Sequence, residues 1–144
     1  MPVTPAIALP VSMERTRPLP IRWTEDIEHL DGATRGELQI PRCTSCGREF
    51  WPAGPVCPFD FSADVDWVTD SGDGVVNSWV RVHRPYFDGD DVPYVVVQVE
   101  LTSGPRLTTS WTGTDTPIIG EPVSVSFREV GPGVWLPEFG SLQA

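Results

Sequence analysis

The chain has 144 residues and a formal net charge of −10 at pH 7. Its ten basic residues are all arginine, which excludes a Schiff-base lysine and a phosphate-loop lysine. Nucleic-acid binders need basic surface to neutralise phosphates, so we expect no nucleic-acid partner. Sixteen Pro and thirteen Gly predict short elements joined by many turns, which favours a mainly β fold.

The first 36 residues predict an N-terminal arm followed by short helices. Residues 1–21 carry five Pro and little periodicity, which is typical of an extended segment. Its scattered apolar side chains suit a groove on another chain. Residues 24–36 predict short helices, limited in length by two glycines. Three apolar residues in or just before these helices could face the chain's own barrel or a partner, and we favour the barrel: Trp23, Ile27 and Leu30.

The N-terminus and the cysteine count bear on location. Residues 1–20 show no charged start followed by a continuous apolar stretch, so we expect no signal peptide. No run of about 18 apolar residues occurs, so we expect no membrane span. Three cysteines, an odd number, argue against a disulfide framework. The cytoplasm is therefore the expected location.

Residues 37–68 predict a degenerate zinc ribbon. The segment holds a C-T-S-C stretch and a C-P-F-D stretch with ten residues between them. A zinc ribbon uses two C-x-x-C knuckles, because each turn directs two thiolates at one tetrahedral metal. The second knuckle has aspartate in the fourth position, and zinc accepts carboxylate oxygen at about 2.0–2.2 Å. The candidate metal ligands are Cys43, Cys46, Cys57 and Asp60.

A relic ribbon without metal is the alternative for this segment. After loss of one thiolate, packing can replace the ion, and four aromatic residues could form such a mini-core: Phe50, Trp51, Phe59 and Phe61. Both readings stay open on the sequence. No helical pattern follows the C-x-x-C, which argues against a thioredoxin-like redox motif. We expect no organic cofactor.

Residues 69–144 predict a five-stranded OB-fold barrel. Within Tyr94–Val99 the apolar run is nearly continuous, which is typical of a strand covered on both sides. Five short strands in about 65 residues suit a small closed barrel, with a sandwich as the alternative. The predicted strands are Val75–Arg84, Pro93–Thr102, Arg106–Thr112, Val123–Glu129 and Val134–Leu136.

Candidate catalytic groups are sparse, and we assign no catalytic residue. The chain has two histidines, His29 and His83, and no G-x-S-x-G. His83 lies at the end of the predicted strand Val75–Arg84, where a surface histidine is the simpler interpretation. Asp88, Asp90 and Asp91 are typical of a solvated hairpin tip, although such a cluster could bind a cation weakly.

The order of short motifs along residues 23–139 resembles a known family. It comprises bacterial and archaeal acyl-CoA-associated proteins built from N-terminal helices, a rubredoxin-like zinc ribbon and an OB-fold. The departure from the family is Asp60, where the family usually has Cys. The motifs are Gly36-Glu37-Leu38, Cys43-x-x-Cys46-Gly47, Trp51-Pro52, Cys57-Pro58, Gly72-x-Gly74-x-Val76-x-Ser78, Pro93-Tyr94-Val95-Val96-Val97, Val99-Glu100-Leu101, Ile119-Gly120-Glu121-Pro122-Val123 and Leu136-Pro137-x-Phe139.

The resemblance implies a non-catalytic accessory subunit that binds and stabilises a thiolase-superfamily or lipid-transfer-protein-like enzyme. That assembly would act on an acyl-CoA substrate, with retro-aldol cleavage of steroid side-chain CoA esters as the favoured reaction. Two other hypotheses stay open. One is a stand-alone protein that binds an acyl-CoA or lipid in the barrel mouth, and the other is an enzyme using His83 with Asp88 or Asp91.

Overall fold

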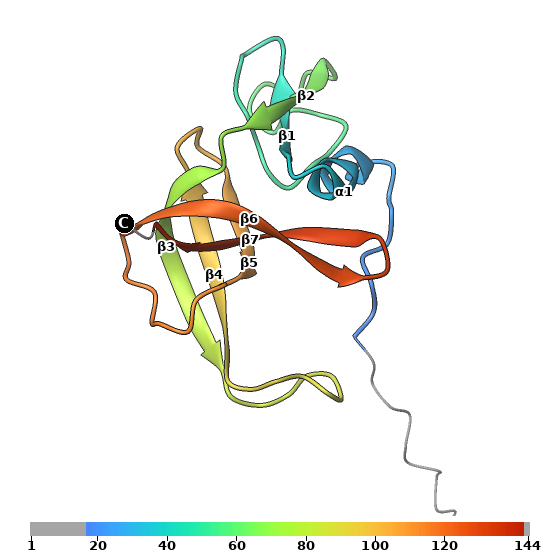
Figure 1. The fold of residues 1–144 in the computed structure, drawn as a ribbon. Coiled ribbons are helices and arrows are strands. Elements are labelled where there is room, and N and C mark those ends of the chain that lie inside the picture. Colours follow the sequence, from blue (N-terminus) through green and yellow to red (C-terminus); the bar gives the residue numbers. More distant parts are fainter. Residues whose placement is uncertain (1–16, 143–144) are drawn as a thin grey trace, which may run out of the picture.

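A computed structural model describes residues 17–142 and places them in two β-sheets and one helix (Figure 1). No helix within the described range is both long and apolar enough to cross a bilayer. The elements are α1 (Ile27–Thr34), β1 (Leu38–Cys43), β2 (Val65–Asp70), β3 (Asp73–Val82), β4 (Tyr94–Leu101), β5 (Arg106–Ser110), β6 (Pro122–Gly131) and β7 (Val134–Ser141).

The five C-terminal strands form one antiparallel sheet in the order β5-β4-β3-β6-β7. A parallel bridge between Trp111 and Phe139 links the β5 end of the sheet to β7, and Thr112 N donates to Phe139 O at 2.9 Å. Strands β3, β4 and β5 form a meander, β6 pairs with β3, and β7 meets the end of β5. This is the OB-fold arrangement. The predicted OB-fold is therefore confirmed.

The barrel core is built from alternate strand positions. Along β4, residues Val97, Val99 and Leu101 are buried, whereas the intervening residues are half-buried. One face of this strand points to the core and the other to the surface. The prediction that β4 is covered on both sides holds only in part, because its outer positions are half-buried rather than buried.

The ribbon adds a two-stranded sheet that packs on the barrel. β1 pairs with β2 in antiparallel register, with Leu38 opposite Asp70 and Cys43 opposite Val65. Leu38 and Ile40 belong to the same apolar cluster as the barrel strands, so the two parts share one core. In Figure 1 this hairpin and its loops project from one end of the barrel, with α1 beside them.

In place of the predicted short helices the described structure has one helix, α1, and only some of the apolar residues in and before it pack as expected. Leu30 is buried, as expected, whereas Trp23 is 61% exposed. The prediction that Trp23 packs on the barrel was wrong, because α1 begins only at Ile27 and the preceding turn directs the indole outward. The arm residues before Arg17 lie outside the described range.

The described end of the arm lies along the chain's own barrel. Arg17 pairs with Asp90 at 2.9 Å, and its guanidinium lies 5.1 Å from the ring centroid of Phe87. A Cβ placed on Gly131 would lie 2.6 Å from Leu19 Cδ2, which shows how closely the arm approaches β6. Residues 17–20 therefore contact this chain, whereas Ile21 is 65% exposed.

A buried histidine joins the helix, the ribbon and the barrel. His29 on α1 is 7% exposed, and its ring centroid lies 4.2 Å from that of Trp51. His29 Nδ1 lies 2.9 Å from the carbonyl oxygen of Gln39 on β1, so this nitrogen carries the proton. Burial lowers the pKa of His29 below 6.5, and the backbone contact to Gln39 and the charge of Asp26 oppose this only in part.

We expect the free energy of unfolding to fall in acid because of His29. A folded-state pKa below the unfolded value means that the stability is fully present above about pH 6.5 and is lost as the pH falls through the lowered pKa. His29→Phe, which keeps an aromatic ring beside Trp51, should flatten this pH dependence in denaturant titrations. His83→Gln is the matched control, since His83 is exposed, and should leave the dependence intact.

Candidate metal centre

The two halves of the ribbon are built as equivalent turns. In the first, Gly47 N donates to Cys43 O at 2.8 Å, and Gly47 has φ 78°. In the second, Phe61 N donates to Cys57 O at 2.9 Å, and Phe61 has φ 61°. The backbone repeats, so Asp60 occupies in the second turn the place that a cysteine occupies in the first.

The four candidate ligands meet at one point. Cys46 Sγ and Cys57 Sγ lie 3.7 Å apart, Cys43 Sγ lies 3.6 Å from each Asp60 carboxylate oxygen, and all four ligand atoms lie within 4.8 Å of one another. Tetrahedral zinc with sulfur at about 2.3 Å and oxygen at about 2.0–2.2 Å needs edges of about 3.8 Å between sulfurs and about 3.6 Å between sulfur and oxygen. The donor set therefore fits a zinc ion.

Backbone N–H groups support the anionic forms of these ligands. Cys46 N donates to Cys43 Sγ and Phe59 N donates to Cys57 Sγ, each at 3.4 Å. Ser62 N donates to Asp60 Oδ1 at 3.0 Å, and this bond is the main reason that the pKa of Asp60 lies below its ordinary value. Zinc ligands must be deprotonated, so these bonds prepare the site for a cation.

The aromatic mini-core expected of a relic ribbon is absent from the described structure. Phe50 is buried with Cys43 and Cys57, but Phe59 is 51% exposed and Phe61 is 79% exposed. Trp51 packs toward the barrel core rather than toward the cysteines. The prediction of a four-residue aromatic core was wrong, because the knuckle turns direct two of these rings outward. Little apolar packing is therefore available to replace a metal.

The other candidate residues lie apart from this centre. His83 is exposed just beyond β3, and His29 is buried against the barrel. Asp90 accepts a bond from Phe87 N at 3.0 Å in addition to pairing with Arg17. The Phe87 N–H and Arg17 hold the pKa of Asp90 below its ordinary value. Asp90 is therefore already paired with two hydrogen-bond donors of this chain, the Phe87 N–H and the Arg17 guanidinium.

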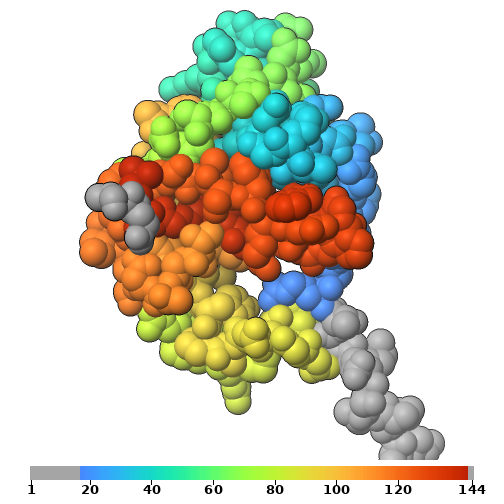
Figure 2. All heavy atoms as spheres, in the orientation of Figure 1, coloured from blue at the N-terminus to red at the C-terminus, as the bar shows by residue number. Residues whose placement is uncertain are grey.

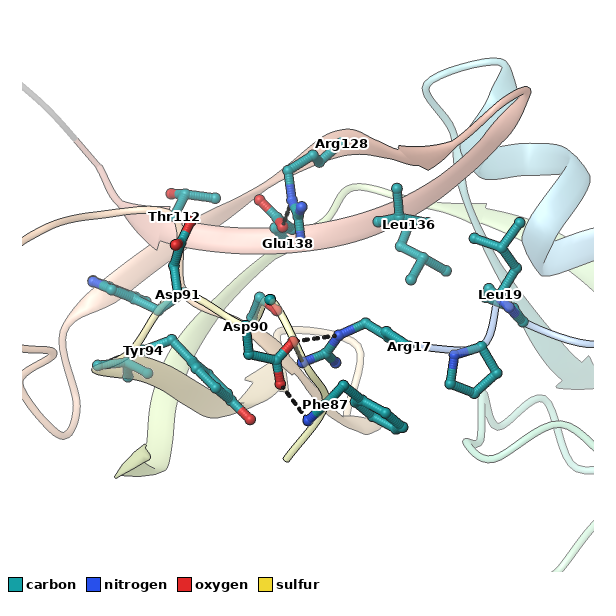
Figure 3. Close-up of a pocket in the computed structure, with 17 residues that line it drawn as sticks. Arg17, Leu19, Phe87, Asp90, Asp91, Tyr94, Thr112, Arg128, Leu136 and Glu138 are labelled. Atoms are coloured by element: carbon teal, nitrogen blue, oxygen red, sulfur yellow. Dashed lines mark hydrogen bonds and ion pairs between the residues drawn. The ribbon is translucent and has the colours of Figure 1, made fainter. Parts of the chain in front are cut away.

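A cavity of about 660 Å³ lies at the barrel mouth, and we call it the mouth cavity. Figure 3 shows Arg17 paired with Asp90 on one side and Arg128 paired with Glu138 on the other. The walls of this cavity could not be located from the sequence, because they come from segments far apart along the chain. Its main lining residues are Arg17, Leu19, Phe87, Tyr94, Leu136 and Glu138.

A two-knuckle ribbon with a tetrahedral donor set, packed on an OB barrel, defines a zinc-ribbon and OB-fold protein. Comparison with known families agrees with this class. Residues 30–66 match the rubredoxin-like zinc ribbon domain of ChsH2, and residues 67–128 match the C-terminal OB-fold domain of ChsH2.

Similar proteins define the family. A chain of the solved Ltp2-ChsH2(DUF35) aldolase is 36% identical, with a TM-score of 0.77 over 85% of this chain and 98% of that chain. A DUF35 domain-containing scaffold protein of Methanothermobacter thermautotrophicus is 32% identical over 100 residues, which are 67% of this chain and 75% of that protein. The chain belongs to the ChsH2/DUF35 family.

Two longer relatives are hydratase subunits. The probable enoyl-CoA hydratase alpha subunit of Thermomonospora curvata is 38% identical over 125 residues, which are 85% of this chain. The 3-oxo-4,17-pregnadiene-20-carboxyl-CoA hydratase alpha subunit of Mycobacterium tuberculosis is 35% identical over 99 residues, which are 67% of this chain. The chain spans only 39% and 32% of these two proteins, respectively.

Proposed function

We propose that this chain is a non-catalytic accessory subunit of a carbon–carbon lyase that acts on acyl-CoA thioesters. It would bind and stabilise a thiolase-superfamily partner of the Ltp2 kind. The observation that carries this proposal is the match over 98% of the ChsH2(DUF35) chain in the Ltp2-ChsH2 aldolase. The name of the scaffold relative in Methanothermobacter supports a structural role.

The substrate class follows from a second relative. The Mycobacterium hydratase alpha subunit is named for a pregnadiene carboxyl-CoA, a steroid with its side chain held as a CoA ester. Retro-aldol cleavage requires a hydroxyl β to the thioester carbonyl, so we propose that the assembly cleaves steroid side-chain CoA esters that carry this hydroxyl, in line with the aldolase name of the solved relative. The partner would hold the reacting groups, which agrees with the lack of lysine in this chain.

The metal would have a structural role. We propose Cys43, Cys46, Cys57 and Asp60 as zinc ligands that hold the two knuckle turns together. Four protein ligands leave no open position for a reacting water, as in other structural zinc sites. None of the three cysteines is in a disulfide, and we propose a location in the reducing cytoplasm, where cysteines stay available as metal ligands.

Mixing experiments distinguish the three hypotheses. The chain alone should neither cleave the steroid CoA ester nor bind it with micromolar affinity, whereas the chain with its Ltp2-type partner should cleave it. A stand-alone carrier would bind the acyl-CoA without the partner, and the mouth cavity is the place where it would do so. An enzyme would turn over alone, and His83→Ala would then cost about 10²–10⁴ in rate.

The N-terminal arm provides a test of how the partner is held. We expect deletion of residues 1–20 to leave the barrel folded by circular dichroism and to weaken association with the partner by about tenfold or more, equivalent to about 1.4 kcal/mol. The reason is the row of apolar side chains that the deletion removes from a segment with too little periodicity to fold alone: Ile7, Leu9, Val11, Met13 and Leu19.

A shorter deletion separates the two halves of the arm. Removing residues 1–16 retains Arg17 and Leu19, which contact the barrel. If the first 16 residues contact the partner, both deletions should weaken binding equally in calorimetric titrations. Unchanged binding by both truncated chains would show that the arm takes no part in docking.

A further inference from the structure

The ribbon presents an apolar tip to solvent. Phe61 is 79% exposed, Phe59 is 51% exposed and Val56 is 43% exposed, and all three lie within or next to the second knuckle. We call these three residues the ribbon tip. In Figure 2 the ribbon forms a lobe at one end of the molecule, so the ribbon tip belongs to a projecting part rather than to a flat face of the barrel.

The backbone of Phe61 shows that this exposure has a cost. Phe61 has φ 61°, and within residues 17–142 it is the one residue other than glycine with positive φ. The equivalent position in the first knuckle is Gly47, which adopts this conformation without a steric penalty. Phe61 is therefore strained relative to glycine, and its exposed ring gains little packing in return. Strain of this kind is typical of functional positions.

The surrounding charge indicates what would cover the ribbon tip. Asp64 is exposed and accepts a hydrogen bond from Ser62, the residue after Phe61. The guanidinium carbon of Arg48 lies 4.3 Å from the centroid of the Phe59 ring. Three thiolates and one carboxylate around zinc would add a net charge of about −2. A second copy of this chain, with net charge −10, would be repelled, as would an anionic lipid surface.

We propose that the ribbon tip is the anchor by which this chain docks into an apolar cleft with a basic rim on its enzyme partner, with Phe61 as the central contact. This inference rests on the proposed function, since it needs an Ltp2-type partner. Buried aromatic anchors surrounded by polar residues are the usual centres of protein interfaces. In the complex, burial of the Phe61 ring would compensate the strain of its backbone.

The test uses a substitution whose effects on folding and on binding have opposite signs. Phe61→Gly relieves the backbone, so the full-length variant should keep its zinc and unfold at the same temperature as the parent chain or higher. Its dissociation constant for the purified Ltp2-type subunit should rise by about tenfold or more. Phe59→Ala should weaken binding in the same direction.

Ile118→Ala is the matched control, because Ile118 is 67% exposed in the loop between β5 and β6. Its binding should equal that of the parent chain. If Phe61→Gly binds as tightly as the parent, or if Ile118→Ala weakens binding equally, the ribbon tip is not the anchor while the proposed function stands. If the parent chain itself fails to bind the subunit, the proposed function fails, and this inference fails with it.

Discussion

Asp60→Ala is expected to release zinc and to unfold the two knuckle turns while the barrel strands remain. Protein prepared without chelator should carry about one zinc per chain, and the binding of structural zinc contributes about 10–16 kcal/mol in small zinc domains. The apolar cluster left around the cysteines is small, with Phe50 as its one large buried side chain and Val65 beside it. Metal analysis together with circular dichroism measures both effects.

Two further substitutions at the knuckle make this result specific. Asp60→Cys restores a four-thiolate site and should hold zinc at least as tightly as the parent chain. Asp64→Ala removes a nearby exposed carboxylate that lies outside the ligand group, and it should keep the metal. A metal-free parent chain with an intact ribbon would contradict the assignment and leave the relic interpretation in place.

Phe139→Ala is expected to destabilise the barrel by about 3–5 kcal/mol, the usual cost of removing a buried aromatic ring. Phe139 on β7 is 0% exposed and belongs to the core cluster shared by the barrel and the ribbon. Its backbone also carries the bridge to Trp111, which links the two edge strands of the sheet. Denaturant unfolding followed by tryptophan fluorescence measures the loss.

Phe127→Ala is the comparison for this change. Phe127 lies on β6 and is only half-buried, so its loss should cost clearly less than that of Phe139. Equal losses would mean that Phe139 is not the centre of the core. The order of the two effects therefore tests the packing of the barrel rather than aromatic content alone.

The barrel strands were predictable because they are rich in the β-branched residues that favour strands. Valine-rich runs identified β3, β4 and β6, and the observed bounds differ from the predicted ones by one or two residues. The end of β7 was missed, since Pro137 and Gly140 are poor strand formers. Tertiary pairing with β6 and the bridge at Phe139 keep this segment extended.

The hairpin of β1 and β2 could not be predicted from local sequence. Pro41 lies within β1, two aspartates lie within β2, and the cysteine loops separate the two strands along the chain. The grouping of Cys43, Cys46, Cys57 and Asp60 was nevertheless predictable, because C-x-x-C spacing is a local feature that fixes where the side chains point.

The outward rings of Phe59 and Phe61 and the walls of the mouth cavity were not predictable. The outward direction of the two rings depends on the left-handed turn at Phe61. The walls of the mouth cavity depend on an ion pair between Arg17 and Asp90, which lie 73 residues apart in the sequence. Composition and spacing carry no information on such contacts. The cavity and the ribbon tip are therefore results of the structure.

Native mass spectrometry of this chain co-expressed with its Ltp2-type partner tests the central claim most directly. An accessory subunit should appear in one assembly whose mass contains both chains, and the assembly should persist through gel filtration at physiological salt. The purified assembly, and neither chain alone, should cleave the steroid CoA ester. Two separate species with the masses of the individual chains, or full activity of the partner without this chain, would contradict the account.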